Sequence, residues 1–291
     1  MFIAGIDGGG THTRLEIRDL ENRLISRAEF GPFNINSIGE EVFRNLLREV
    51  FACCGAMEQC AAICVGGAGI SNPRVKEVLA EELSAANFSG KWKLCGDQEI
   101  ALRGAMEDPG IVVISGTGSI CFGKNALGET ARSGGFGHLV DDGGSGYALG
   151  RDVLSAALRT VDGRADSPKL LEAVYERLGA CDPGTIVSFV YSPKTDKAAI
   201  AKFSAIALQE PEATAILLRG AEELYEMVQA VQRKLSLSGC PIALLGGLLL
   251  GDNPYRRVVK DKLSQLGSVI SPSHDALWGA AQTAWELYNE C

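Results

Sequence analysis

Glycine-rich turns follow apolar segments at several places in this sequence. Some of these turns also contain threonine or serine, and others contain glycine alone. Three such turns occur far apart in the chain: Gly8-Gly9-Gly10-Thr11, Gly116-Thr117-Gly118-Ser119 and Gly246-Gly247. Glycine lets a ligand approach the backbone closely, and successive N–H groups form a concavity that binds anions. One such turn alone is more typical of an ordinary connection between two secondary-structure elements. Three of them together fit one nucleotide held between two lobes.

Two aspartates stand where apolar segments end. Asp7 closes the segment 2–7 just before the first glycine turn, and Asp97 follows the segment 92–95 and Gly96. A carboxylate at a strand end can hold Mg²⁺ through water or take the proton of a hydroxyl group. A turn-capping role for Asp7 and a helix N-cap role for Asp97 are the plainer interpretations. The adjacent glycines favour the functional interpretation for Asp7, and the residues alone leave both open for Asp97.

Composition excludes several classes of protein. The chain has 291 residues, with 28 Lys and Arg against 36 Asp and Glu, so its formal net charge is −8. Neither a basic run nor a Gly-Lys-Ser/Thr phosphate loop occurs, which argues against a nucleic-acid groove and a P-loop. The start lacks the features of a signal peptide, and the longest apolar stretch is too short to span a bilayer. The 9 cysteines are scattered without metal-ligand spacing, so we expect a cytoplasmic protein.

Hydrophobic spacing predicts the elements that position these residues. An N-terminal meander of three strands ends with residues 24–30, and strands at 61–65 and 92–95 then alternate with helices at 40–54, from Pro73, and at 98–106. Strands at 120–124 and 130–133 precede a helix at 145–160, a mostly helical stretch at 167–238 and a final helix at 277–288. A meander followed by alternating helices and strands predicts an α/β sheet with parallel members.

The ordered set of motifs resembles the BadF/BadG ATPase group of the actin/hexokinase/Hsp70 superfamily, which includes N-acetylglucosamine kinases. The resemblance rests on six stretches: 5–11, 95–97, 114–119, 135–145, 245–247 and 275–281. It implies an α/β fold of two ribonuclease-H-like domains with ATP between them. Without a low-complexity linker, we place the domains at 1–119, to which helix 276–291 returns, and at 120–275, with helical additions.

The resemblance also implies roles for individual residues. Asp97 falls at the position of the catalytic base, and Asp7, at its strand end, would hold Mg²⁺ through water. ATP would contact Asp7, Gly9, Gly10, Thr11, Thr13, Gly116, Thr117, Gly118, Gly246 and Gly247. The sugar would contact Asn34, Asp97, Ser119, Gly135, Phe136 and Asp142, with Asn36 a competing register for Asn34 and Asp141 the solvated neighbour of Asp142.

The expected activity is ATP-dependent phosphorylation of an amino sugar, with N-acetylglucosamine first and N-acetylmuramic acid or glucosamine next. Phe136 and Gly143 stand where similar kinases often have tryptophan and glutamate, so we expect a wider sugar pocket. The partners expected are the amino sugar and ATP, with no nucleic acid and no membrane, and a homodimer is left open. Two alternatives remain: an activator ATPase of a dehydratase or benzoyl-CoA reductase system, and a sugar sensor without catalysis. The activator's cluster-binding cysteine is absent before Gly116.

Overall fold

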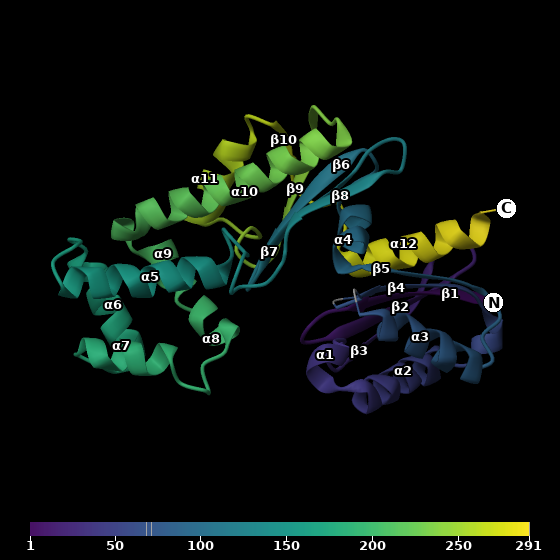
Figure 1. The fold of residues 1–291 in the computed structure, drawn as a ribbon. Coiled ribbons are helices and arrows are strands. Elements are labelled where there is room, and N and C mark those ends of the chain that lie inside the picture. Colours follow the sequence, from purple (N-terminus) through teal and green to yellow (C-terminus); the bar gives the residue numbers. More distant parts are fainter. Residues whose placement is uncertain (68, 71, 291) are drawn as a thin grey trace. The chain divides into compact units, whose positions relative to one another are not determined.

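The computed structural model describes residues 1–67, 69–70 and 72–290 and divides the chain into two compact units (Figure 1). The first unit consists of Met1–Asp108 and the C-terminal segment from Pro272, and the second consists of Pro109–Ser271. Cys291, the last residue of the expected helix 276–291, lies outside the described residues. The C-terminal helix thus belongs with the N-terminal part of the chain.

The first unit is built on a sheet with strand order β3-β2-β1-β4-β5. Its strands are β1 (Phe2–Gly8), β2 (Thr13–Asp19), β3 (Leu24–Phe30), β4 (Cys60–Gly67) and β5 (Lys91–Gly96). Its helices are α1 (Ile35–Ile38), α2 (Glu40–Cys54), α3 (Pro73–Ala85), α4 (Asp97–Ala105) and α12 (Ala276–Asn289), with a 3₁₀ turn at Met57–Gln59. The meander β1–β2–β3 is antiparallel, whereas β4 and β5 extend the sheet in parallel from β1.

Alternation along β1 gives this sheet two buried faces. Ala4 and Ile6 belong to the core that α2 and α3 cover, whereas Ile3 packs with residues of α4 and α12 on the opposite face. A Cβ atom added to Gly5 would lie 2.2 Å from the backbone nitrogen of Ala281. Glycine at this position therefore lets α12 lie against the strand at backbone distance.

The second unit repeats the same topology with strand order β10-β9-β6-β7-β8. Its strands are β6 (Gly110–Ser115), β7 (Ser119–Lys124), β8 (Thr130–Gly134), β9 (Gly239–Leu245) and β10 (Gly267–Ile270). Its helices are α5 (Gly146–Val161), α6 (Pro168–Leu178), α7 (Pro183–Val190), α8 (Lys197–Ala201), α9 (Ser204–Gln209), α10 (Thr214–Leu235) and α11 (Pro254–Leu263), with a 3₁₀ turn at Pro211–Ala213. Again a three-stranded antiparallel meander is followed by two parallel strands. Two α/β units of one topology confirm the fold class that the resemblance implied.

The domain boundary differs from the expected position after Ser119. The structure divides the chain between Asp108 and Pro109, so β6 belongs to the second sheet. The physical reason is local pairing: β6 and β7 form an antiparallel hairpin from Ile111 opposite Gly123 to Ser115 opposite Ser119. A boundary after Ser119 would separate the two strands of one hairpin.

Most of the predicted elements are confirmed, including the third strand of the meander and helix α2 at their expected bounds. The short helix α1 and the strand β10 were not expected, because each has too few residues to show a hydrophobic period. Among the described helices, none has the length and apolar character needed to cross a membrane.

Candidate phosphate and sugar site

The turn between β1 and β2 is a tight hairpin loop. The Gly9 N–H donates to the His12 carbonyl oxygen at 2.9 Å and is therefore spent on closing the loop. Gly10 and Thr11 lie exposed at its tip, where the Thr11 hydroxyl lies 2.9 Å from the His12 ring nitrogen Nδ1. Of the backbone amides expected to bind phosphate, those of Gly10 and Thr11 are accessible at the tip. The Gly9 amide could bind phosphate only if the turn opened.

Thr13 does not lie in this exposed tip. Its side chain is fully buried, and its hydroxyl donates a 2.7 Å hydrogen bond to the carbonyl oxygen of Gly31. The hydroxyl thus ties β2 to the end of β3. The sequence motif does not show which of two neighbouring threonines points inward, and in this geometry Thr11 is the one with an exposed side chain. A contact between Thr13 and ATP stays a prediction.

Asp7 is paired with an arginine that the sequence analysis missed. Arg14 stands opposite Asp7 in the β1–β2 register, and its Nη2 donates to Asp7 Oδ2 at 2.6 Å. Its Nη1 donates to Asp275 Oδ2 at 2.9 Å. The Asp7 side chain is 15% exposed, so the pair is partly shielded from water. The hairpin register was the available signal, because directly opposed residues of an antiparallel pair share one face.

Asp97 begins helix α4 but is not its N-cap. Gly96 is the N-cap residue, and its N–H donates to Glu99 Oε1 at 3.1 Å. The Asp97 carboxylate accepts a hydrogen bond from the Gln98 N–H at 2.9 Å and is exposed. Gly96 and Glu99 therefore cap the helix, and the Asp97 carboxylate is not needed for that role.

The surroundings of Asp97 favour its protonated form. Although the residue reaches solvent, the protein around its carboxyl group removes part of the hydration, and the nearby charge of Asp7 adds to this effect. Together they raise the pKa of Asp97 above its ordinary value. A carboxylate with a raised pKa is a better proton acceptor than an ordinary aspartate.

Asn34 lies at the start of α1, where its Oδ1 accepts a hydrogen bond from the Asn36 N–H at 3.1 Å. A Cβ atom added to Gly69 would stand 3.0 Å from the same Oδ1, so glycine makes room for the amide. Asn36 is the alternative candidate for the sugar-binding asparagine, and its Oδ1 accepts a 2.8 Å hydrogen bond from Asn72 Nδ2. Asn34 is half-buried and Asn36 exposed, which makes Asn34 the better-positioned amide of the two.

The second unit holds the turn after β6 against the start of α5. The Gly116 N–H donates to the Gly118 carbonyl oxygen at 2.9 Å, so this amide too closes its own turn. The carbonyl oxygens of Gly116 and Thr117 accept hydrogen bonds from the N–H groups of Gly146 and Tyr147 at 2.7 and 3.2 Å. Thr117 is exposed and Gly116 has open space around it. The turn is rigid and faces outward at Thr117.

Ser119 supports the structure rather than an open site. It is 4% exposed, and its hydroxyl donates to the Gly143 carbonyl oxygen at 2.7 Å. The next residue, Gly144, accepts hydrogen bonds from Ser115 Oγ at 2.8 Å and from the Tyr255 hydroxyl at 2.7 Å. These three donors fix the glycine-rich loop, and the expected sugar contact of Ser119 would compete with one of them.

Asp142 is a buried residue with an unusual backbone conformation. Its backbone adopts a left-handed conformation with φ of 61°, and the residue is 5% exposed. A Cβ atom added to Gly118 would lie 3.0 Å from Asp142 Oδ2, so the carboxylate lies directly beside the turn that follows β6. In the described part of the chain, no donor is bonded to this carboxylate. A non-glycine residue held in this conformation is enriched at ligand sites.

The loop before Asp142 presents an aromatic ring to solvent. Phe136 is 66% exposed between Gly135 and Gly137, which have φ of 76° and 98°. The Arg132 guanidinium lies 4.6 Å from the ring centroid of Phe136. Asp141 accepts a 3.0 Å hydrogen bond from the Phe136 N–H, so it holds the loop and is not merely solvated.

Gly143 does not widen a pocket, contrary to expectation. A Cβ atom at this position would lie 2.5 Å from Glu223 Oε2 and 3.0 Å from the Glu223 Cβ. The space that a side chain at 143 would take is thus already filled from α10. A position that lacks a side chain in the sequence can be filled by a residue far along the chain.

Gly246 and Gly247 differ in what their missing side chains allow. Gly246 has φ of 88°, and a Cβ atom there would lie 2.3 Å from the Ser115 carbonyl oxygen. Gly247 is exposed and has no atom within 4 Å of such a position. Gly246 therefore permits the approach of β9 to the end of β6, and Gly247 is the one open to a ligand.

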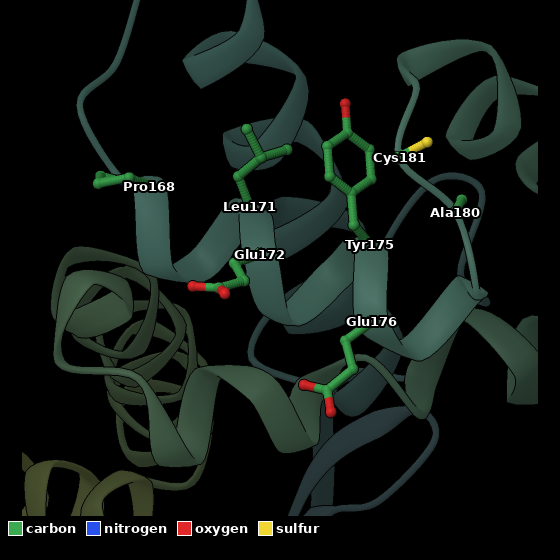
Figure 2. A pocket seen from close by; sticks show the side chains of 7 residues that line it. All are labelled: Pro168, Leu171, Glu172, Tyr175, Glu176, Ala180 and Cys181. Atoms are coloured by element: carbon green, nitrogen blue, oxygen red, sulfur yellow. The ribbon is translucent and has the colours of Figure 1, made fainter.

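A separate shallow pocket of about 540 Å³ lies on helix α6, where the sticks of Figure 2 show Glu172 and Glu176 on the same helix as Leu171 and Tyr175. It is lined by Pro168, Leu171, Glu172, Tyr175, Glu176, Ala180 and Cys181. None of these is an expected site residue, and the pocket is not part of the candidate site.

The described residues contain no group of three or more metal-binding side chains. Mg²⁺ in phosphoryl-transfer sites is usually held by one or two carboxylates, waters and the phosphates. Asp7 alone can fill the protein's share of such a set, since its Oδ1 has no hydrogen-bond partner within the described residues. The donor set therefore fits a metal that arrives with a nucleotide.

Known proteins resemble this chain over almost its whole length. An N-acetylmuramic acid/N-acetylglucosamine kinase of Clostridium acetobutylicum is 32% identical over 296 residues, which covers 96% of both chains. An N-acetyl-D-glucosamine kinase of Dictyostelium discoideum is 28% identical and covers 84% of both. A crystal structure from Chromobacterium violaceum, provisionally named an N-acetylglucosamine kinase, has a TM-score of 0.75 at 24% identity and 99% coverage of both chains, and it bears on the fold alone.

A family profile completes the comparison. The profile of the BadF/BadG/BcrA/BcrD ATPase family matches residues 4–284, a range that begins within β1, contains the three glycine-rich turns and includes most of α12. Together with the two-unit fold, this match establishes that the chain belongs to the BadF/BadG/BcrA/BcrD ATPase family.

Proposed function

We propose that this protein is an ATP-dependent amino-sugar kinase that phosphorylates N-acetylglucosamine and N-acetylmuramic acid at the 6-hydroxyl group. The observation that carries the proposal is Asp97, an exposed carboxylate at a strand end with a raised pKa and a helix cap supplied by other residues. The relatives named as kinases of these two sugars support the choice of acceptor.

In the proposed reaction, the sugar oxygen attacks the γ-phosphorus of ATP as the bond from that phosphorus to the β–γ bridging oxygen breaks. The hydroxyl proton passes to the Asp97 carboxylate, and ADP leaves. Bound Mg²⁺ would neutralise charge on the phosphates, with Asp7 as its protein partner through water. The exposed residues Thr11, Thr117 and Gly247 are our candidates for contacts with ATP.

Three residues are our candidates for holding the sugar. The Asn34 amide and the Asp142 carboxylate would bond its hydroxyl groups. The exposed ring of Phe136 would stack on the apolar face of the pyranose. We expect the protein to act in the cytoplasm, where ATP is available, and the eight described cysteines are all free thiols, as suits a reducing compartment.

A coupled assay of ADP release tests this function with five acceptors: N-acetylglucosamine, N-acetylmuramic acid, glucosamine, N-acetylmannosamine and glucose. We expect turnover with the first two sugars and loss of that turnover in Asp97→Asn, which retains ATP binding. ADP release that is independent of any sugar, or a sugar-dependent rate that Asp97→Asn leaves unchanged, would contradict the proposal.

A further inference from the structure

Arg14 joins two carboxylates that belong to opposite ends of the chain. Its Nη2 donates to Asp7 Oδ2 at 2.6 Å, and its Nη1 donates to Asp275 Oδ2 at 2.9 Å. The two bonds leave from different nitrogen atoms of one planar guanidinium group. Such a rigid fork fixes the direction of both bonds, which a lysine ammonium cannot do.

The Asp275 end of this bridge is itself fixed. Asp275 is the N-cap of α12, and its Oδ1 accepts a 2.9 Å hydrogen bond from the Trp278 N–H. Its other oxygen therefore points toward Arg14 in a direction set by the helix. The start of α12 is held in turn by the hydrogen bond from the His274 N–H to the Gly104 carbonyl oxygen at 2.8 Å. The guanidinium thus has a rigid anchor.

The Asp7 end is the one with a chemical consequence. The Asp7 side chain is 15% exposed and that of Arg14 is 39% exposed, so the pair is stronger than a fully solvated one. Arg14 occupies Oδ2 and leaves Oδ1 as the carboxylate oxygen for a further ligand.

We propose that Arg14 is a positioning residue for Mg²⁺·nucleotide binding: anchored by Asp275, it holds the Asp7 carboxylate turned so that Oδ1 receives the hydrated metal. The inference rests on the proposed function only in requiring that Asp7 serve a metal-bound nucleotide. Residues that orient a metal-binding side chain typically change metal affinity 10–100-fold when they are replaced.

The test measures ADP binding by isothermal titration calorimetry at several Mg²⁺ concentrations, without sugar and without turnover. Arg14→Met retains the side-chain length but removes the charge and the fork, and we expect it to raise the Mg²⁺ midpoint for ADP binding about 10–100-fold. Arg14→Lys should recover part of the loss. Asp275→Asn, which retains a capping oxygen, should raise the midpoint by a smaller factor because only the anchor is lost.

Urea unfolding of the same variants separates positioning from simple stabilisation. If Arg14→Met unfolds more easily but has the wild-type Mg²⁺ midpoint, the residue is structural and the inference fails. If it weakens metal-free ADP as much as Mg²⁺·ADP, Arg14 contacts the phosphates and the inference also fails. Absence of Mg²⁺-dependent ADP binding in the wild-type protein would instead count against the proposed kinase itself. If Arg14→Met does not fold, Arg14→Lys and Asp275→Asn still decide the question.

Discussion

The charge of Asp7 acts on Asp97: loss of hydration around the Asp97 carboxyl group and the nearby charge of Asp7 both raise the pKa of Asp97. A carboxyl group whose pKa is raised by folding lowers the stability of the folded state once the pH exceeds its unfolded value of about 3.9. The loss grows until the pH passes the raised folded value and is constant above it. Asp97 should therefore reduce stability at neutral pH.

Replacement of Asp97 by asparagine should consequently change activity and stability in opposite directions. Loss of the base should lower kcat by on the order of 10²–10⁴. The free energy of unfolding at pH 7 should rise, because asparagine can still accept the Gln98 N–H bond without carrying a charge. This gain should shrink as the pH is lowered toward 4. Steady-state kinetics and urea unfolding across this pH range measure the two effects. A destabilised variant with normal kcat would show that Asp97 has a purely structural role.

The repulsion between Asp7 and Asp97 can be measured directly by a double-mutant cycle. The stability gained by Asp97→Asn should be smaller in an Asp7→Asn background, since one cause of the raised pKa is then absent. Asp19→Asn provides the matched control, because Asp19 pairs with Arg23 and is not among the causes of the Asp97 shift. If Asp97→Asn gains the same stability in the wild-type, Asp7→Asn and Asp19→Asn proteins, desolvation alone raises the pKa of Asp97.

The neighbouring threonines of the first hairpin should separate stability from nucleotide binding. Thr13→Val removes the buried hydroxyl that donates to Gly31, and we expect a loss of about 1–3 kcal/mol in the free energy of unfolding with an unchanged KM for ATP. Thr11→Val alters an exposed side chain, so its stability should change by no more than about 0.5 kcal/mol while the KM for ATP rises. A higher KM for ATP in Thr13→Val at unchanged stability would restore the sequence-based expectation for Thr13.

Sequence patterns predicted the elements well where a period or a glycine turn defines them. The helix Glu40–Cys54 has its expected bounds because its apolar residues follow a helical period and Gly39 and Gly55 flank it. The strand Leu24–Phe30 ends as expected where Gly31 follows it. Asp7 was selected as a candidate because it ends a strand beside a glycine turn, whereas the roles expected for Asp97 and Asp142 came from the family resemblance. Such local signals need no knowledge of tertiary contacts.

The features that sequence reasoning missed depend on contacts between distant residues. Nothing near Arg14 indicates Asp275, which is 261 positions away, and nothing near Gly143 indicates Glu223. The boundary was misplaced because β6 is an apolar run buried throughout most of its length, and such a run does not indicate which sheet it joins. Sequence reasoning also did not predict that the side chains of Thr13 and Ser119 are buried, with their hydroxyl groups turned inward.

Gly279 offers a test of the close packing that fixes the start of α12. Helix propensity predicts that Gly279→Ala should stabilise an internal helical position by up to about 1 kcal/mol. The structure predicts the opposite sign, because the new Cβ would lie 2.0 Å from the Ile100 carbonyl oxygen and 2.6 Å from the Gly104 nitrogen. Both are backbone atoms of α4, which cannot move aside alone, so we expect a net loss of about 1–3 kcal/mol or more in the free energy of unfolding.

Gly31→Ala is the matched control for this substitution. A Cβ atom at Gly31 meets no atom within 4 Å, and its unfolding free energy should stay close to that of the wild-type protein. In Gly279→Ala, displacement of α12 should also move Asp275, which anchors Arg14, so the Mg²⁺ midpoint for ADP binding should rise along with the loss of stability. A stabilised Gly279→Ala variant would mean that α12 does not lie at backbone distance from α4. A destabilised variant with the wild-type Mg²⁺ midpoint would mean that the anchor at Asp275 tolerates the shift of its helix.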